Sequence, residues 1–473
     1  MIWFVGMLHD LVVFTEWIFL SYFVLMNAGY LTLNVLSIIT LRRYMPSKVM
    51  DSLPQLYSGM EFPVSIIVPA YNEEATIVGA IQSMLQLDYP EFEVIIVNDG
   101  SKDGTLDVLK REFVLVPFPE AYRTRLDTKP THGMFQSTRY SNLRVIDKEN
   151  GGKADSLNAG INASRYPLFC GVDADTVLQR DSMLRIVYPF LEDGRVVATG
   201  GTVRIANGCI ISGGQLVEVG LPRNLLALFQ VVEYLRAFLF GRLGWSSING
   251  LLIISGAFGL FRKETVIEVG GYRSNTIGED MELVVRMHRL LRQKNQVYRM
   301  IFLPDPVAWT EAPEDLKTLK NQRIRWQRGL AESLSSNLGL MFSRNGGPPG
   351  WLAFPFMTIF EWLGPFIELF GIIIMALLAL FGTISWEAFW VLIFVAVGFG
   401  LLLSISGLLL EEMSFHLYKG TRHLLMLLMA VLLENIGYRQ LNSVWRVIGM
   451  YQWATGSKSK WGEMKRNAVW VEK

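Results

Sequence analysis

One run of residues near the start of the chain limits what this protein can be. Residues 11–41 carry a single charged side chain, Glu16, and a transmembrane helix needs about 20 consecutive, mostly apolar residues. A secretory signal would have a shorter apolar core with positive charge before it, whereas Asp10 precedes this run and no Lys or Arg occurs before Arg42. The run therefore predicts an uncleaved membrane anchor.

Three more apolar stretches lie toward the other end of the chain, at residues 351–381, 386–410 and 423–451. The third carries Glu434 and Arg439. Charges inside a membrane segment are costly and usually face a bundle interior, so a segment lying partly at the membrane surface is the alternative for this stretch.

Basic residues near the ends of membrane helices indicate the cytoplasmic side. Arg42, Arg43 and Lys48 follow the first run and place the next residues in the cytoplasm. Later cations also indicate the cytoplasm: Lys419, Arg422, Lys458, Lys460, Lys465 and Arg466. Four simple spans would put the tail outside, so we expect the third C-terminal stretch not to cross as a simple span.

These features predict a multi-pass protein of the plasma (inner) membrane in three parts. Residues 1–47 would form the anchor, residues 48–347 a cytoplasmic domain, and residues 348–473 transmembrane helices with a short basic tail. Charged residues make up only 18% of the chain, against about 25% in soluble proteins. The net charge of +1 argues against nucleic-acid binding through bulk charge.

The middle of the chain alternates short apolar runs with helical periodicity. The apolar runs predict buried strands at residues 64–68, 93–97, 143–146 and 167–172. Helical patterns follow the first three runs, and this order predicts an α/β fold with a mostly parallel sheet. Residues 114–142 break the rhythm, and we expect an inserted loop there. Ligands of such sheets bind at the carboxyl ends of strands, where Asp99, Asp173 and Asp175 fall.

Several short motifs have both a functional and an ordinary structural interpretation. Asp173 and Asp175 would point the same way along an extended chain, which suits a divalent cation on phosphates or a solvated acidic turn. Gly151-Gly152-Lys153 would open a helix toward an anion or simply cap it. Glu279-Asp280 would favour a helix start or supply a general base. Gln322-Arg-Ile-Arg325-Trp326 lies in a basic helix typical of membrane surfaces.

The order of these motifs resembles the family 2 membrane glycosyltransferases, which include cellulose, hyaluronan, chitin and poly-N-acetylglucosamine synthases. The resemblance covers residues 62–330 and rests on Pro69-Ala-Tyr71-Asn72-Glu73, Asn98-Asp99-Gly100-Ser101, Gly151-Gly152-Lys153, Asp173-Ala-Asp175, Ile254-Ser255-Gly256-Ala-Phe258, Gly278-Glu279-Asp280 and Gln322-x-x-Arg325-Trp326. Asn98 stands where many members have Asp, and Gly278 where cellulose synthases have Thr, so cellulose synthase is a weaker match.

The resemblance implies a GT-A type, Rossmann-like catalytic domain and a role for each motif residue. The donor nucleotide would be contacted by Tyr71, Asn72, Glu73, Asp99 and Lys153. Mg²⁺ or Mn²⁺ and the diphosphate would be held by Asp173 and Asp175. The catalytic base would be Asp280, with Glu279 beside it. The acceptor sugar and pyrophosphate would be held by Ser255, Gly256, Gln322, Arg325 and Trp326.

The implied reaction moves a sugar, with inversion, from a UDP-sugar to a growing β-linked polysaccharide. UDP-N-acetylglucosamine and UDP-glucose are the leading donors, the bilayer and a glycan or lipid acceptor are the expected partners, and oligomers or export subunits stay open. The alternative is a non-processive transferase that adds one sugar to a membrane lipid. A catalytically inactive relative is disfavoured because every expected acidic group is present, and a dehydrogenase because no Gly-x-Gly-x-x-Gly follows the first strand.

Overall fold

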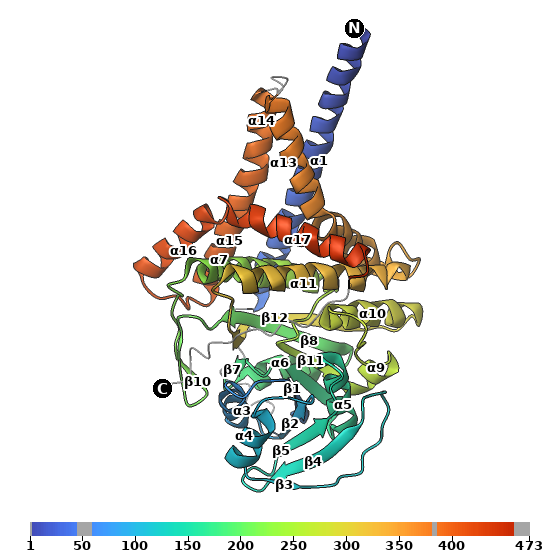
Figure 1. Ribbon diagram of the computed structural model, residues 1–473, viewed down its shortest axis with the longest axis vertical. Helices are drawn as coiled ribbons and strands as arrows, with labels where there is room; N and C mark the ends of the chain where they lie inside the picture. Colours follow the sequence, from blue (N-terminus) through green and yellow to red (C-terminus); the bar gives the residue numbers. More distant parts are fainter. Residues whose placement is uncertain (1, 45–58, 381–385, 458–473) are drawn as a thin grey trace.

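The computed structural model describes residues 2–44, 59–380 and 386–457. Lys48 and the tail cations at residues 458–466, which entered the topology argument, lie outside the described residues. Figure 1 shows a sheet with its helices at one end of the molecule and α1 (Ile2–Tyr44) projecting from the other end, beside α13 (Gly364–Leu380) and α14 (Trp386–Ile393).

Within the described residues, one helical segment is long and apolar enough to cross a membrane, Val13–Tyr44. Two bent pairs pass the same test only if each pair is one broken span. They are Pro349–Trp362 with Gly364–Leu380, bent by 40°, and Thr421–Leu433 with Tyr438–Ala454, bent by 57°. The sharp bend in the second pair agrees with the expectation that residues 423–451 do not form a simple span. The full multi-pass arrangement stays a prediction.

A layer of helices separates the projecting helices from the sheet. Figure 1 shows α7 (Leu225–Leu235), α11 (Leu316–Ser335), α16 (Thr421–Leu433) and α17 (Tyr438–Ala454) lying across the molecule at this level. A bidentate ion pair from Arg323 to Glu233, with N–O distances of 2.5 and 2.8 Å, joins α11 to α7. The hydroxyl of Tyr438 donates to the same carboxylate at 3.1 Å, which ties α17 to both helices.

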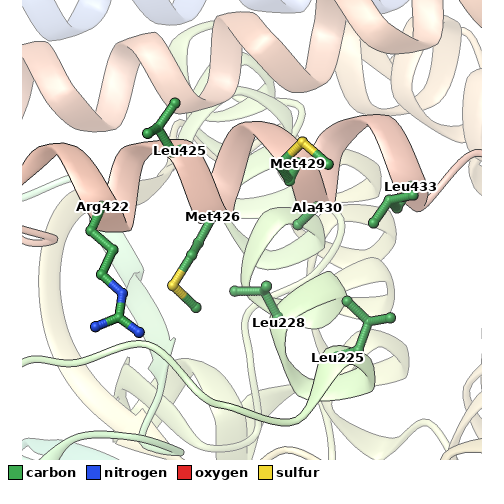
Figure 2. A pocket seen from close by; sticks show the side chains of 8 residues that line it. All are labelled: Leu225, Leu228, Arg422, Leu425, Met426, Met429, Ala430 and Leu433. Carbon is green, nitrogen blue, oxygen red and sulfur yellow. The ribbon is translucent and has the colours of Figure 1, made fainter.

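An apolar groove of about 450 Å³ lies between α7 and α16 (Figure 2). It is lined by Leu225, Leu228, Arg422, Leu425, Met426, Met429, Ala430 and Leu433. None of these is a predicted site residue, so the groove belongs to the helical layer and not to the candidate active site.

The sheet of the described residues has ten strands in the order β3-β4-β5-β2-β1-β6-β11-β8-β12-β7. Its strands are β1 (Val64–Ala70), β2 (Phe92–Asn98), β3 (Leu115–Pro117), β4 (Thr131–Ser137), β5 (Leu143–Lys148), β6 (Leu168–Val172), β7 (Val177–Leu178), β8 (Val196–Ile205), β11 (Phe258–Arg262) and β12 (Arg299–Thr310). A separate hairpin pairs β9 (Ile210–Ser212) with β10 (Gln215–Glu218).

The four strands predicted from apolar runs are confirmed as β1, β2, β5 and β6, which pair in parallel. The expectation of a mostly parallel sheet is wrong for the sheet as a whole. β11 runs antiparallel between β6 and β8, and β3, β4 and β7 also pair antiparallel. β11 enters from the opposite end because the chain between β8 and β11 first crosses the helical layer as α7, η2 (Arg236–Arg242) and α8 (Leu243–Ser247).

The expectation of a loop at residues 114–142 is also wrong in part, because β3 and β4 extend the sheet there. β4 is only partly buried along most of its length. A strand that is only partly buried on either face shows no clear alternation of apolar and polar residues, which is why the pattern was not visible in the sequence.

The remaining helices cover the sheet or join its strands. They are α3 (Ile77–Leu85), α4 (Thr105–Glu112), α5 (Lys153–Ala163), α6 (Ser182–Glu192), α9 (Lys263–Glu268), α10 (Glu279–Gln293), η3 (Leu338–Leu340), η4 (Pro349–Ala353), α12 (Phe354–Phe356), η5 (Met357–Trp362), η6 (Phe394–Gly398) and α15 (Phe399–Ser414).

The strand registers bring the predicted motifs to one edge of the sheet. Ala70 at the end of β1 lies opposite Asn98 at the end of β2. Val172 at the end of β6 lies opposite Phe258 at the start of the antiparallel β11. The residues that follow β1, β2 and β6, and those that precede β11, therefore share this edge, where ligands of such sheets bind.

Candidate active site

The loop after β1 is tied to the loop after β2. Asn72 has a φ of 55°, in the left-handed region that asparagine tolerates better than most residues. Its N–H donates to Ser101 Oγ at 3.1 Å, and its Oδ1 accepts from the N–H of Lys102 at 2.9 Å. The N–H of Glu73 donates to Thr105 Oγ1 at 2.9 Å. These bonds give the predicted nucleotide loop a defined shape in the protein alone.

Asp99 has protein partners on both carboxylate oxygens and is only 3% exposed. Oδ1 accepts from Lys148 Nζ at 2.7 Å and from the N–H of Gly151 at 2.9 Å. Oδ2 accepts from the N–H of Gly152 at 2.8 Å and from Asn150 Nδ2 at 3.1 Å. Asp99 therefore holds the glycine turn that opens α5, and its contact with uracil stays a prediction.

Lys148 is a supporting residue that the sequence analysis missed. It is fully buried, and its Nζ lies 2.7 Å from both Asp99 Oδ1 and Asp155 Oδ1. One ammonium group thus forms ion pairs with two carboxylates beneath the nucleotide loop. The available signal was a lysine two residues after the apolar run at residues 143–146, within the strand β5, but its burial depends on α5 packing over the sheet.

Lys153 brings together carboxylates that are far apart in the sequence. Its Nζ lies 2.5 Å from Asp173 Oδ1 and 3.6 Å from Glu279 Oε1, and 3.5 Å from the carbonyl oxygen of Gly256. Burial opposes the charge on Lys153, but Asp173 and Glu279 outweigh it and raise the lysine pKa above its ordinary value. The ammonium is therefore charged at neutral pH.

Glu279 and Asp280 lie in the first turn of α10, where acidic groups are favoured by the helix dipole. Asp280 Oδ2 accepts from the N–H of Gly256 at 3.2 Å, and Oδ1 accepts from the N–H of Met281 at 2.8 Å. Burial raises the pKa of Glu279 to about 7, with Lys153 opposing the shift and Asp280 adding to it. Glu279 therefore faces the ammonium of Lys153, whereas Asp280 is held by backbone N–H groups.

The loop before β11 completes this edge. Gly256 touches both halves of the cluster, because its carbonyl faces Lys153 and its N–H faces Asp280. Ser255 is partly exposed, and its Oγ accepts from the N–H of Ala257 at 3.4 Å. Tyr71, after β1, is also partly exposed. Gly256, a predicted acceptor residue, thus contacts both Lys153 of the donor group and the proposed base Asp280.

The other predicted acceptor residues, Gln322, Arg325 and Trp326, lie on α11. Trp326 is 43% exposed, and the guanidinium of Arg323 lies over its ring at 4.7 Å. Gln322 is buried, and its Oε1 has no hydrogen-bond partner within the described residues. The side chains at 322, 325 and 326 are spaced to share one face of the helix.

Backbone contact fixes α11 against the start of α10. A Cβ placed on Gly278 would lie 2.9 Å from Gly329 Cα. Ser333 Oγ donates to the carbonyl of Gly278 at 3.2 Å, and Glu332 Oε2 accepts from the N–H of Ile277 at 2.8 Å. These contacts give α11 a fixed place beside the Glu279-Asp280 turn.

The metal-binding prediction has only two candidate ligands. Across residues 2–44, 59–380 and 386–457, no group of three or more His, Cys, Asp or Glu side chains forms a metal cluster. Asp173 and Asp175 provide hard oxygen ligands, and the Asp173 side chain is 31% exposed. Mg²⁺ is usually bound by one or two carboxylates with substrate phosphates and water completing its shell. The two aspartates fit such an ion.

Comparison with known structures shows the class of fold. A mannosyltransferase from Pyrobaculum calidifontis, solved with GDP-Man and Mn²⁺, is similar over 92% of this chain and 100% of its own, with a TM-score of 0.50 and 16% sequence identity. The mixed sheet is therefore GT-A-like.

The sequence matches are more specific. Residues 169–405 match the family described as "Glycosyl transferase family group 2", and residues 65–120 match "Glycosyl transferase family 2". The chain belongs to the family 2 glycosyltransferases.

Two curated relatives are each named poly-beta-1,6-N-acetyl-D-glucosamine synthase. The one from Staphylococcus epidermidis is 28% identical over 272 residues, and the one from Staphylococcus aureus strain COL is 29% identical over 274 residues. Each match covers 57% of this chain and spans 55% of the relative's length.

Proposed function

We propose that this protein is a membrane-bound synthase that moves N-acetylglucosamine, with inversion, from a UDP-sugar to a growing β-linked polysaccharide. The observation that carries the proposal is the cluster of Lys153, Asp173, Glu279 and Asp280, assembled from three separate segments at the ligand-binding edge of the sheet. The names of the two relatives support the choice of sugar and of a polymeric product.

Asp280 is the base in this proposal. Its carboxylate accepts the proton of an acceptor hydroxyl while that oxygen attacks the anomeric carbon, and UDP leaves from the opposite face. A single displacement converts the α-linked donor into a β-linked product. The N–H of Gly256, donating to Asp280 Oδ2, holds the carboxylate in place without removing its capacity to accept a further hydrogen bond.

In this proposal Lys153, Asp173 and Asp175 stabilise the leaving group, UDP. Asp173 and Asp175 would hold Mg²⁺ or Mn²⁺, which stabilises negative charge on the departing diphosphate. Lys153 lies within reach of Asp173 and adds a positive charge on the same side. Glu279, with a pKa of about 7, adjusts the charge of this cluster near neutral pH.

In this proposal the helical layer binds the acceptor sugar, and the helices beside it lie in the bilayer. The exposed ring of Trp326 on α11 offers a flat surface for an acceptor sugar. Arg42 and Arg43 lie in the last turn of α1, so the positive-inside rule supports a cytoplasmic catalytic domain. We extend this to a multi-pass arrangement in which the bent helix pairs are embedded beside α1.

The test is a turnover assay on the full-length protein in lipid nanodiscs, with Mg²⁺ or Mn²⁺ and a panel of UDP-sugars. We expect UDP release with UDP-N-acetylglucosamine and a product ladder of many sugars by gel or mass spectrometry. A product carrying one sugar on a lipid would refute the polymerase assignment. No UDP release with any donor would refute the reaction.

A further inference from the structure

Gln327 follows Trp326 on α11, and its side chain leaves the helix about 100° around the axis from that of Trp326. Its Nε2 donates to the carbonyl oxygens of Trp362 at 2.9 Å and of Glu361 at 3.3 Å. Its Oε1 accepts from Arg446 Nε at 2.7 Å. The residue is only 2% exposed, and both ends of its amide are bound by other elements, although no motif assigned it a role.

Arg446 on α17 joins this amide to the helices on the membrane side. Its Nη2 donates to the carbonyl oxygen of Glu361 at 2.5 Å and to Oε2 of the same residue at 2.9 Å. The hydroxyl of Tyr30 on α1 donates to the other carboxylate oxygen of Glu361. One guanidinium thus links α11, α17 and η5, and Glu361 extends the link to α1, which contains the helical segment apolar enough to cross a membrane.

Backbone packing brings α17 close enough to α11 for these bonds to form. The two helices pack against each other (Figure 1). A Cβ on Gly449 would lie 2.7 Å from the carbonyl oxygen of Ile324 and 3.1 Å from Gln327 Cβ, so a side chain there would push the helices apart. Arg446 precedes Gly449 by three residues and therefore shares its face of α17.

We propose that Arg446 is a positioning residue for the acceptor site: through Gln327 it fixes the rotation of α11 about its axis, and with it the direction in which Trp326 meets the acceptor sugar. This role rests on the proposed function. The contact of Gly329 with the start of α10 sets how near α11 lies to the proposed base, whereas Arg446 sets which way the side chains of α11 point. A misplacement of about 1 Å can lower a rate about a hundredfold.

The test measures sugar transfer and donor binding separately, on the full-length protein in lipid nanodiscs with Mg²⁺. We expect Arg446→Met to slow transfer from saturating UDP-N-acetylglucosamine by about ten- to a hundredfold and to shorten the products, while UDP affinity stays unchanged. Arg344→Met is the matched control, since Arg344 is exposed on the loop before η4 and should change neither quantity.

Two further variants separate positioning through Gln327 from a general loss of packing. Gln327→Met should slow transfer as much as Arg446→Met, and the double variant should be no slower than either single one, because the same link is broken in each. Arg446→Lys keeps a cation beside Glu361 but loses the Nε donor, so transfer should slow while the thermal unfolding midpoint stays near that of the wild type.

Two results would overturn the inference. One is a double variant in which the two effects add, which would show that Arg446 and Gln327 act independently. The other is a UDP affinity that falls as much as the transfer rate, which would show a general loss of structure. Wild-type protein that releases no UDP with any UDP-sugar would instead refute the proposed function itself.

Discussion

Gly278 and Gly329 lie in direct backbone contact, so that a Cβ on either one would come within 2.9 Å of backbone atoms of the other. This contact sets the distance between the Glu279-Asp280 turn of α10 and the helix that carries Gln322, Arg325 and Trp326. It also explains why glycine stands at position 278, because a side chain there would separate the two helices.

We expect Gly329→Ala to lower turnover by pushing α11 away from α10. Overpacking of this kind costs about 1–3 kcal/mol, and a displaced α11 should raise the KM for the acceptor more than it affects UDP binding. The matched control is Gly339→Ala, where a Cβ would meet only Arg289 Cδ at 3.9 Å. Equal kinetics for the two variants would show that the contact has no effect on the site.

Asp280→Asn should strongly slow sugar transfer and preserve the fold. The loss of a general base lowers the rate by about 100-fold or more, while affinity for the UDP-sugar should stay within a few-fold of the wild type. Steady-state UDP release and equilibrium donor binding measure the two effects. Asp107→Asn, at an exposed position in α4, is the control, and a transfer rate for Asp280→Asn close to that of this control would exclude Asp280 as the base.

Removing divalent ions with EDTA should stop turnover, and Mg²⁺ or Mn²⁺ should restore it. Because Asp173 and Asp175 are the proposed ligands, Asp175→Asn should raise the Mn²⁺ concentration for half-maximal activity by about tenfold, equivalent to about 1.4 kcal/mol of ion binding. Titration of metal-free protein with each ion gives the measurement. Full activity in EDTA would contradict the metal assignment.

Lys148→Met should be strongly destabilising. Lys148 is buried between Asp99 and Asp155, and removal of one partner of a buried ion pair costs about 3–5 kcal/mol because charge is left uncompensated. Lys102→Met makes the same chemical change at an exposed position and should leave the unfolding midpoint nearly unchanged. Thermal unfolding followed by tryptophan fluorescence compares the two variants.

Because His288 is buried, we expect the free energy of unfolding to depend on pH. Burial lowers its pKa to about 4, and its ring nitrogens lie 2.6 Å from Tyr298 Oη and 2.8 Å from the carbonyl of Leu251. Between pH 6.5 and 4 the unfolded chain binds a proton that the folded protein does not, so the free energy of unfolding falls as pH drops through this window.

This contribution is fully present above pH 6.5 and amounts to about 3 kcal/mol from the separation of the two pKa values. His288→Gln removes the titrating group. We therefore expect the midpoint of the wild type to fall more steeply than that of the variant between pH 6.5 and 4. Parallel midpoint curves for the two proteins would contradict this.

Much of the site could be located from local sequence order. The apolar runs before Tyr71, Asp99 and Asp173 predicted strands, and strands of one parallel sheet end at a common edge. The structure confirms these strands and places the three residues directly after them. Asn98, a departure from the family pattern, donates to Asp147 Oδ1 at 2.7 Å, where an aspartate would place two carboxylates together.

Other features could not be read from the sequence because they depend on contacts between distant segments. The antiparallel β11 follows from the route of the chain through the helical layer. The buried ammonium of Lys148 depends on Asp99 and Asp155, which lie 49 residues before it and 7 after it along the chain.

By itself, the sequence determined a helix apolar enough to cross a membrane, the α/β core and the list of acidic groups, because apolar runs and strand ends are local signals in the chain. The tertiary structure decided which charges meet. Ion pairs such as Lys153 with Asp173 form only when the sheet edge and α5 come together, and burial there changes their electrostatics by removing water.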